Sequence, residues 1–261
     1  MAAVSSAESS VSLKLLAQYL DDLLDIKNIA DWPNAHNGLQ IENASGAVKK
    51  IGAAVDASER TIREAAQRGV NFLLVHHGLF WAGAQPLRGA FFRKIKIALD
   101  ADLAIYSAHL PLDVHPRVGN NAELCRALGF KKTEPFFFEK GRFIGKKASV
   151  EIAREDLVRR LEKILGSSVK LCAGGPSRCK KIGVVTGGAG GEISKAAREG
   201  IDTFITGEGP HHSAIDAEEL GVNVLYGGHY ATEIFGVKSL AKHLSKRFRA
   251  PWEFIDHPTG L

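Results

Sequence analysis

Residues 50–78 read KIGAAVDASERTIREAAQRGVNFLLVHHG, and residues 181–209 read KIGVVTGGAGGEISKAAREGIDTFITGEG. The two stretches align without a gap. They share the opening Lys-Ile-Gly, a central isoleucine, a pair of alanines and two later glycines. In each, an apolar run, a helical pattern and a second apolar run predict a strand–helix–strand unit. We interpret the recurrence as an internal repeat of this unit.

The segment after each unit also recurs, at a slightly different offset. HLPLD at residues 109–113 stands opposite HYATE at residues 229–233. In both, a histidine comes directly after an apolar strand pattern and precedes a carboxylate by four residues. Glycine-bounded strand–helix units also resemble one another by convergence, and the backbone pattern leaves that alternative open. The matched histidine and carboxylate positions favour duplication.

Strand and helix patterns alternate along most of the chain, which predicts an α/β fold with mostly parallel sheets covered on both faces. The repeat predicts two related α/β domains with a metal site in the cleft between them. We expect the first half, with His76, His77 and Asp113, at residues 1–130 and the second half at residues 181–261. Residues 131–180 are expected to form a short divergent insert.

The composition is that of a soluble globular protein. Of the 261 residues, 45% are hydrophobic and 24% are charged, which is ordinary for one large or two small domains. The net charge is +5, and the densest basic run covers residues 242–249. A solvated helix face accounts for such a run. No nucleic-acid-reading motif accompanies it, so a nucleic-acid partner is disfavoured.

Cysteine use and hydropathy indicate the cytoplasm and no membrane partner. The three cysteines, Cys125, Cys172 and Cys179, form no C-x-x-C pair, which disfavours a disulfide framework and a thiolate zinc site. Residues 1–10 are small and polar, and the first cation, Lys14, follows them in the wrong order for a signal peptide. No apolar run reaches the ~18 residues of a membrane span.

Histidines and carboxylates gather just past predicted strands, where parallel sheets bind their ligands. Imidazole together with carboxylate oxygen suits Zn, Mn, Fe or Ni. Taken singly, each is as well explained by packing, capping or solvation. Taken together they predict a metal site, and few protein ligands per ion leave positions open for water, as in catalytic sites. The residues are His76, His77, His109, Asp113, Glu208, His229 and Glu233.

Three neighbouring segments leave alternatives open. The glycine-rich run at residues 186–192 lies between a strand and a helix, but it lacks the last glycine of G-x-G-x-x-G, so a tight turn competes with a phosphate-binding loop. Residues 37–40 either donate amide hydrogen bonds near the site or form a plain turn. Trp81 either walls the pocket or packs. Pro111 predicts a loop between His109 and Asp113.

At these residues the chain resembles the Nif-three-like family, often labelled GTP cyclohydrolase type-two homologues. The matching motifs follow one another in order over nearly the whole chain. They are NGLQ at 37–40, VHHGLFW at 75–81, HLPLD at 109–113, GNNA at 119–122, FITGE at 204–208 and GHYATE at 228–233.

The resemblance implies a dinuclear centre of two divalent transition-metal ions per chain, with Glu233 able to bridge both. It also implies two similar α/β domains and a homohexameric ring. A long inserted domain found in some members is absent here. The implied ligands are His76, His77, Asp113, His229 and Glu233.

A metal-dependent hydrolase is the function we expect from this set. Two ions activate water and clamp the oxygens of a small anionic or nucleotide-like substrate. Glu208 and His109 have no ligand duty in the implied set, so we expect them to move protons as catalytic residues. The alternative is a non-enzymatic metal-binding, interaction or regulatory protein. The additional titratable groups Glu208, His109 and His212 favour the enzyme.

Overall fold

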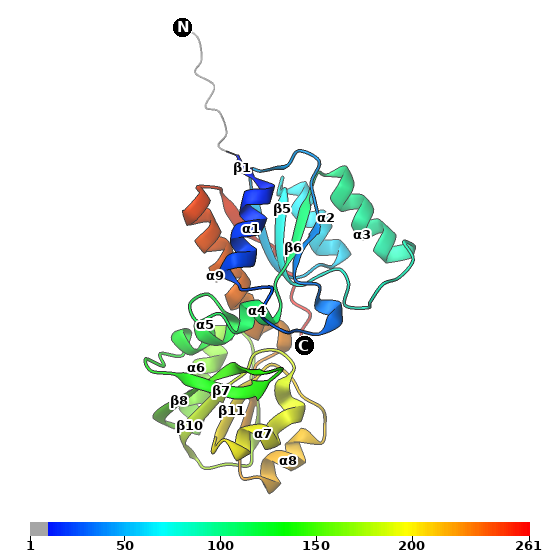
Figure 1. Cartoon of the computed structure of the whole chain (residues 1–261). Coiled ribbons are helices and arrows are strands. Elements are labelled where there is room, and N and C mark those ends of the chain that lie inside the picture. The colour runs from blue at the N-terminus through cyan, green and yellow to red at the C-terminus, as the bar shows by residue number, and fades with distance from the viewer. Residues whose placement is uncertain (1–9) are drawn as a thin grey trace. The chain divides into compact units, whose positions relative to one another are not determined.

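The computed structural model describes residues 10–261, which form two compact units. The first unit contains residues 10–111 and 237–257, and the second contains residues 112–236 and 258–261. Each unit is a sheet covered by helices, which confirms the predicted α/β class (Figure 1). Apart from Ser10, the N-terminal segment used to argue against a signal peptide lies outside the described residues.

The first unit is built on a five-stranded sheet whose central strands are nearly continuous apolar runs, as expected for strands covered on both faces. Four neighbouring strands are parallel, and β2 joins one edge antiparallel. A small antiparallel pair, β1 (Val11–Ser12) and β3 (Ala47–Val48), accompanies the sheet. The order in the sheet is β13 (Trp252–Phe254), β4 (Ile51–Asp56), β5 (Phe72–His77), β6 (Ala104–Ser107) and β2 (Gly38–Ile41).

Two layers of helices cover this sheet, with α2 and α3 on one face and α1 and α9 on the other (Figure 1). The core beneath α2 and α3 includes Ile62, Leu73 and Ile105. The Ser58 hydroxyl accepts the Thr61 N–H at 3.0 Å and so caps α2. The helices are α1 (Leu13–Leu23), η1 (Pro33–Ala35), α2 (Glu59–Gln67), α3 (Gly89–Asp100), α4 (Leu110–Asp113) and α9 (His229–Phe248), of which α4 and α9 continue into the second unit.

The second unit has a six-stranded sheet whose centre repeats that of the first. The parallel order β10–β11–β12 matches β4–β5–β6, and an antiparallel strand flanks each set, β9 beside β12 and β2 beside β6. The internal repeat is therefore confirmed in topology. The order is β7 (Glu134–Glu139), β8 (Arg142–Ala153), β10 (Arg178–Val184), β11 (Thr203–Thr206), β12 (Asn223–Tyr226) and β9 (Lys170–Ala173).

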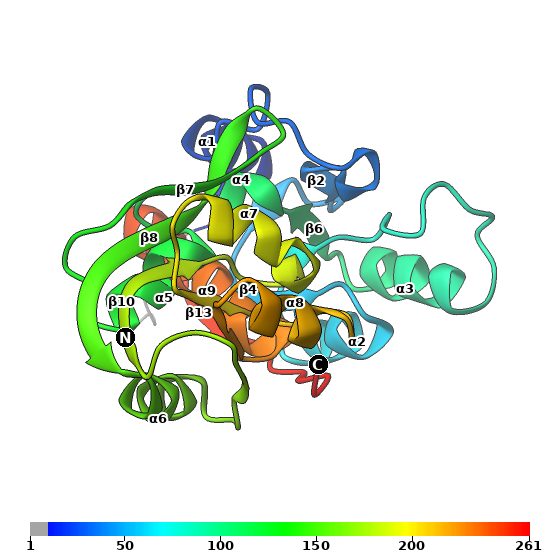
Figure 2. The ribbon, with the colours of Figure 1, turned by 90° about the horizontal axis from the view of Figure 1, so that it is seen from below.

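Helices α5 and α6 pack on one face of this second sheet, while α7 and α8 lie side by side against the other (Figures 1 and 2). Leucines of α5 and α6, among them Leu124 and Leu161, join Ile205 in a buried core. The helices are α5 (Asn120–Ala127), α6 (Arg154–Leu165), η2 (Ala189–Glu192), α7 (Ile193–Arg198) and α8 (Ser213–Glu219).

The unit boundaries differ from the expected 1–130, 131–180 and 181–261. The expected insert is no separate part, because its strands β7, β8 and β9 complete the six-stranded sheet. Asp113 belongs to the second unit, not the first, and residues 237–257 return to the first unit. The physical reason is strand pairing: β13 near the C-terminus hydrogen-bonds in parallel to β4, a contact that no local pattern encodes.

One local expectation also changes. The segment between His109 and Asp113, expected as a loop, contains one helical turn, α4, because Pro111 lies in its first turn, where a missing N–H is tolerated. The last helix, α9, begins at His229. Within residues 10–261, no helix combines the length and apolar character needed to cross a membrane.

Candidate metal centre

Three histidines meet at the carboxyl edge of the first unit's sheet. His76 and His77 end β5, and His109 follows β6. Because β5 and β6 are parallel neighbours, their carboxyl ends lie at the same edge. One ring nitrogen from each histidine lies within 4.8 Å of the others. The structure thus places His109 beside the pair at the end of β5, and we call these three residues the histidine cluster.

Each imidazole of the histidine cluster is oriented through Nδ1. That atom lies 2.8 Å from the Ala108 carbonyl oxygen in His76, 2.8 Å from Asp56 Oδ1 in His77 and 3.0 Å from Asp31 Oδ1 in His109. A carbonyl or carboxylate partner requires the proton on Nδ1, so Nε2 is the nitrogen that carries the lone pair, as in metal-binding histidines. This second layer of contacts is typical of metal-binding histidines.

The sequence interpretation missed Asp31. This carboxylate, whose side chain is 5% exposed, also accepts hydrogen bonds from Asn37 Nδ2 at 2.8 Å and the Leu110 N–H at 3.0 Å. Burial raises the pKa of Asp31, but its contacts with His109 and Asn37 outweigh that effect and lower the pKa below its usual value. An ionised Asp31 therefore holds His109. It lies 78 residues away along the chain, and no sequence signal pointed to it.

Asp56 was also missed, although a signal existed. It ends β4 directly beside His77 in the strand register, the same kind of position as the strand-end histidines. Asn37 supplies the amide contact that competed with a plain turn, because its Oδ1 accepts the His109 N–H at 2.7 Å. Trp81 stands edge-on to His77 and His109, with ring centroids 5.6 and 4.7 Å away, so it walls the histidine cluster.

The second unit has its own cluster around the start of α9. His229 and Glu233 lie on successive turns of the helix, with Nε2 and Oε2 3.2 Å apart. His229 Nδ1 donates to Glu208 Oε1 at 2.8 Å. Burial lowers the pKa of His229, but hydrogen bonds and charges from Glu233 and Glu208 outweigh it and raise the pKa to about 9. The surroundings of this imidazole therefore favour a positive charge.

The glycine-rich run packs directly against this second cluster. A Cβ on Gly187 would lie 2.2 Å from Glu233 Oε1, and the residue has a φ of +74°. Its N–H donates to Thr232 Oγ1 at 3.1 Å. Only glycine meets both demands, since a side chain here strains the backbone and displaces the carboxylate. This geometry supports the tight-turn interpretation of residues 186–192.

Asp113 is tied to the same region of the second unit. It is buried, and its Oδ1 accepts from Asn120 Nδ2 at 2.8 Å. Asn120 Oδ1 in turn accepts the Gly236 N–H of α9 at 2.6 Å. The Asn120 amide thus links Asp113 to the helix that carries His229. Asp113, Glu208, His229 and Glu233 form what we call the acidic cluster, whereas His212 is an exposed residue preceding α8.

The donor chemistry of both clusters fits a divalent transition metal. Imidazole nitrogens fixed by Nδ1 contacts and buried carboxylates are the ligands that Zn, Mn, Fe and Ni accept. Glu233 is 2% exposed and Asp113 is 7% exposed, so neither is an ordinary surface carboxylate. Buried carboxylates of this kind require compensation by cations or hydrogen bonds.

Comparison with known proteins identifies the family. The model of the family described as Duf34/NIF3 (NGG1p interacting factor 3) matches residues 11–259. The chain belongs to the Duf34/NIF3 family. The resemblance drawn from the sequence motifs is thereby confirmed.

Relatives of this Duf34/NIF3 protein match over most of their length. A Deinococcus radiodurans protein named GTP cyclohydrolase 1 type 2 homolog is 41% identical over 86% of each chain. One of the same name from Archaeoglobus fulgidus is 39% identical over 96% of this chain and 100% of its own. The crystal structure of TTHA1606 from Thermus thermophilus superimposes with a TM-score of 0.88 at 39% identity, covering 96% of this chain and 100% of that one.

Proposed function

We propose that this Duf34/NIF3 protein binds two divalent transition-metal ions per chain, with Glu233 touching both. The observation that carries the proposal is the uniform orientation of the imidazoles. Nδ1 of all four histidines, His109 included, contacts a carbonyl or carboxylate oxygen, and Nε2 of His229 faces the Glu233 carboxylate at 3.2 Å. The proposed ligands are His76, His77, Asp113, His229 and Glu233.

We propose a hydrolase acting on a small anionic or nucleotide-like substrate. When bound, the ions supply a water of lowered pKa and a Lewis acid for the substrate's oxygens. The remaining chemistry falls to this chain. His109, held by Asp31, presents Nε2 for proton transfer, and Glu208 uses one carboxylate oxygen for His229, which leaves the other to accept a proton. Trp81 shields the histidine cluster on one side.

Metal analysis of the purified, metal-loaded protein tests the first part. We expect about two ions per chain, because five nitrogen and oxygen ligands with one bridging carboxylate suffice for an open two-metal site. A stoichiometry near zero in folded protein would overturn the proposal. The ion that binds best is then used in a hydrolase screen. The screen includes GTP, since relatives carry the name GTP cyclohydrolase 1 type 2 homolog.

Two substitutions test the catalytic roles. Glu208→Gln and His109→Asn remove basicity with little change of shape, so both variants should keep their metal and lose about 10²–10⁴-fold in turnover. Melting temperature, metal content and rate are measured on one preparation. A lower melting temperature with an unchanged rate per folded molecule would reduce both residues to structural roles.

A non-enzymatic role is the second candidate, and the family description as an interacting factor favours it. The same residues then bind metal to stabilise a surface for a partner protein. An unproductive screen, together with metal-dependent capture of one defined partner, would select this alternative. We also propose a homohexameric ring in the cytoplasm. Light scattering of the purified protein and cell fractionation test those two statements.

A further inference from the structure

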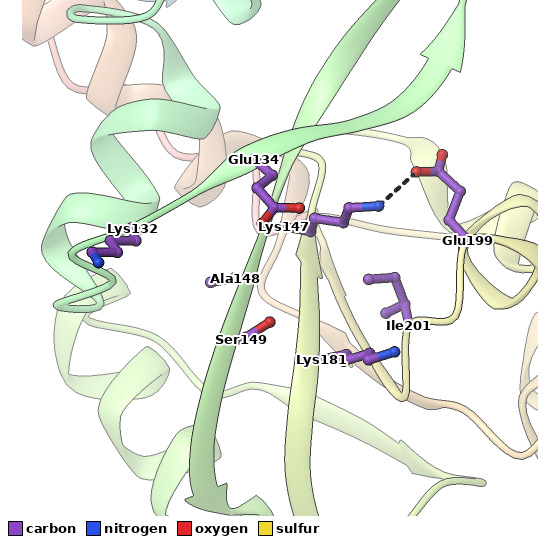
Figure 3. Close-up of a pocket in the computed structure, with 8 residues that line it drawn as sticks. All are labelled: Lys132, Glu134, Lys147, Ala148, Ser149, Lys181, Glu199 and Ile201. Atoms are coloured by element: carbon purple, nitrogen blue, oxygen red, sulfur yellow. Dashed lines mark hydrogen bonds and ion pairs between the residues drawn. The ribbon is translucent and has the colours of Figure 1, made fainter.

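The second unit has a pocket of about 320 Å³ on the face that carries β8 and β10 (Figure 3). No residue of the histidine or acidic cluster lines it. Ile201 provides an apolar floor. The charged and polar lining residues are Lys132, Glu134, Lys147, Ser149, Lys181 and Glu199. Such a volume lies at the lower end of the ~300–1,000 Å³ typical of small-molecule sites.

Strand pairing places three of these side chains on one face. Ser149 of β8 is directly opposite Lys181 of β10, and Lys147 precedes Ser149 by two residues. Because side chains alternate along a strand, residues two apart share a face. Figure 3 shows Lys147, Ser149 and Lys181 directed to the same side, toward the segment that carries Glu199 and Ile201.

The positive charge in this pocket exceeds the negative charge that compensates it. The Lys147 Nζ atom lies 3.4 Å from Glu199 Oε2. The other oxygen of this carboxylate, Oε1, accepts the Phe137 N–H at 2.9 Å. Among the described residues, no carboxylate lies within ion-pair distance of the Lys181 ammonium, and the same holds for Lys132. Lys147 and Lys181 occupy diagonal positions of neighbouring strands, where long side chains are within reach of each other and like charges repel. An anion beside Lys147 and Lys181 would remove that repulsion.

We propose that this pocket binds the phosphate group of a small molecule. Lys147 and Lys181 contact the phosphate oxygens, and the Ser149 hydroxyl donates a hydrogen bond to them. The buried Ile201 gives the lysines a low-dielectric wall on one side, and such walls focus the field of the charges beside them. Glu134 accepts hydrogen bonds from hydroxyl groups on the organic part of the ligand.

Calorimetric titration of the full chain tests the proposal, with ribose 5-phosphate and inorganic phosphate as the probes. The protein is stripped with a chelator first, because phosphate also binds metal ions. We expect saturable binding that weakens with added salt. Lys181→Gln should weaken it about tenfold or more, since a charge-assisted hydrogen bond is lost.

Lys180→Gln is the matched control, because it removes the same charge from the adjacent residue of β10, which does not line the pocket. Its affinity should stay within about twofold of the parent, and melting temperatures should show both variants folded. Equal loss in the two variants would reveal only general attraction by a basic surface and would overturn the proposal, as would the absence of saturable binding.

The two probes separate the sources of the phosphate group. Tighter binding of ribose 5-phosphate assigns the pocket to a phosphate ester, and equal affinity assigns it to the free ion; both outcomes support the proposal. Ribose without phosphate should not bind. Binding of ribose as tight as that of its phosphate would show that the lysines do not select the ligand.

Discussion

The two units share a strand–helix–strand scaffold but carry different side chains at the ends of the aligned strands. In the first unit, Asp56 ends β4 and holds His77 at the end of β5. In the second unit, the aligned positions are Gly187 and Glu208. There the Glu208 carboxylate, two residues past the end of β11, contacts His229 instead, and Gly187 makes room for Glu233. An aspartate–histidine pair has thus been exchanged for a glycine and a glutamate.

Close packing explains why the second unit has no counterpart of His76. The aligned residue is Gly207, where a Cβ would lie 2.7 Å from the Gly187 carbonyl oxygen and equally close to the His229 Cα. No side chain fits there. In the first unit, His76 occupies the same strand position and contacts the Ala108 carbonyl oxygen. The two units therefore share a backbone scaffold, while nitrogen donors dominate the first unit and carboxylates the second.

The largest effect is expected on metal binding when the carboxylate of Glu233 in the second unit is replaced. Glu233→Gln removes the charge of the proposed bridging ligand. Its metal affinity should therefore fall by more than the roughly 10–100-fold expected when an outer partner is changed. The metal content of the purified variant should fall as a result. Glu208→Gln, the control in the same cluster, should retain its ions at saturating metal. Elemental analysis of both variants decides, and equal metal loss would show that the roles are wrongly assigned.

The close approach of Gly187 to Glu233 can be tested by substitution, with Gly221 as the control. Gly187 and Gly221 have φ values of +74° and +66°, but a Cβ on Gly221 meets nothing within 4 Å. Gly221→Ala should therefore cost only the left-handed strain, roughly 1–2 kcal/mol of unfolding free energy. Gly187→Ala should cost more and should also weaken metal binding, because it displaces Glu233. Denaturation and metal titration measure both, and identical behaviour would contradict the steric argument.

Protonation should stabilise the acidic cluster in chelator-treated protein. Because the pKa of His229 is raised to about 9, its stabilising contribution is fully present below pH 6.5 and is lost as the pH rises through 9. The loss should be on the order of 3 kcal/mol of unfolding free energy. Denaturation of the parent and of His229→Gln from pH 6 to 10 measures it. A stability difference that stays constant with pH would refute the prediction.

The smallest effect is expected for the two carboxylates that hold a histidine ring through Nδ1, Asp56 beside His77 and Glu208 beside His229. Asp56→Asn and Glu208→Gln each weaken the acceptor that faces a histidine Nδ1, while an amide oxygen still orients the ring. Metal affinity should fall about tenfold in each, at the low end for such partners. Competition with a chelator of known affinity measures both variants. An unchanged affinity in Asp56→Asn alone would show that only the second unit depends on its carboxylate.

Local patterns were enough to predict the repeat, the alternation of strands and helices, and the residues at the strand ends. Periodicity and motif spacing are properties of short segments, so the alignment of residues 50–78 with 181–209 identified both scaffolds. The same alignment put His76, His77 and Glu208 at strand ends, where the structure has them. Asp56 was within reach of this reasoning, because it too ends a strand.

Only the tertiary structure decided which partners those residues have. Asp31 and His109 meet across 78 residues of sequence, and β13 completes the first sheet from the far end of the chain. Glu208, predicted from sequence as a catalytic base, also holds His229. The physical reason is that hydrogen bonds and strand pairing depend on distance in space. The sequence by itself determined which groups stand at the strand ends, and folding determined what each of them contacts.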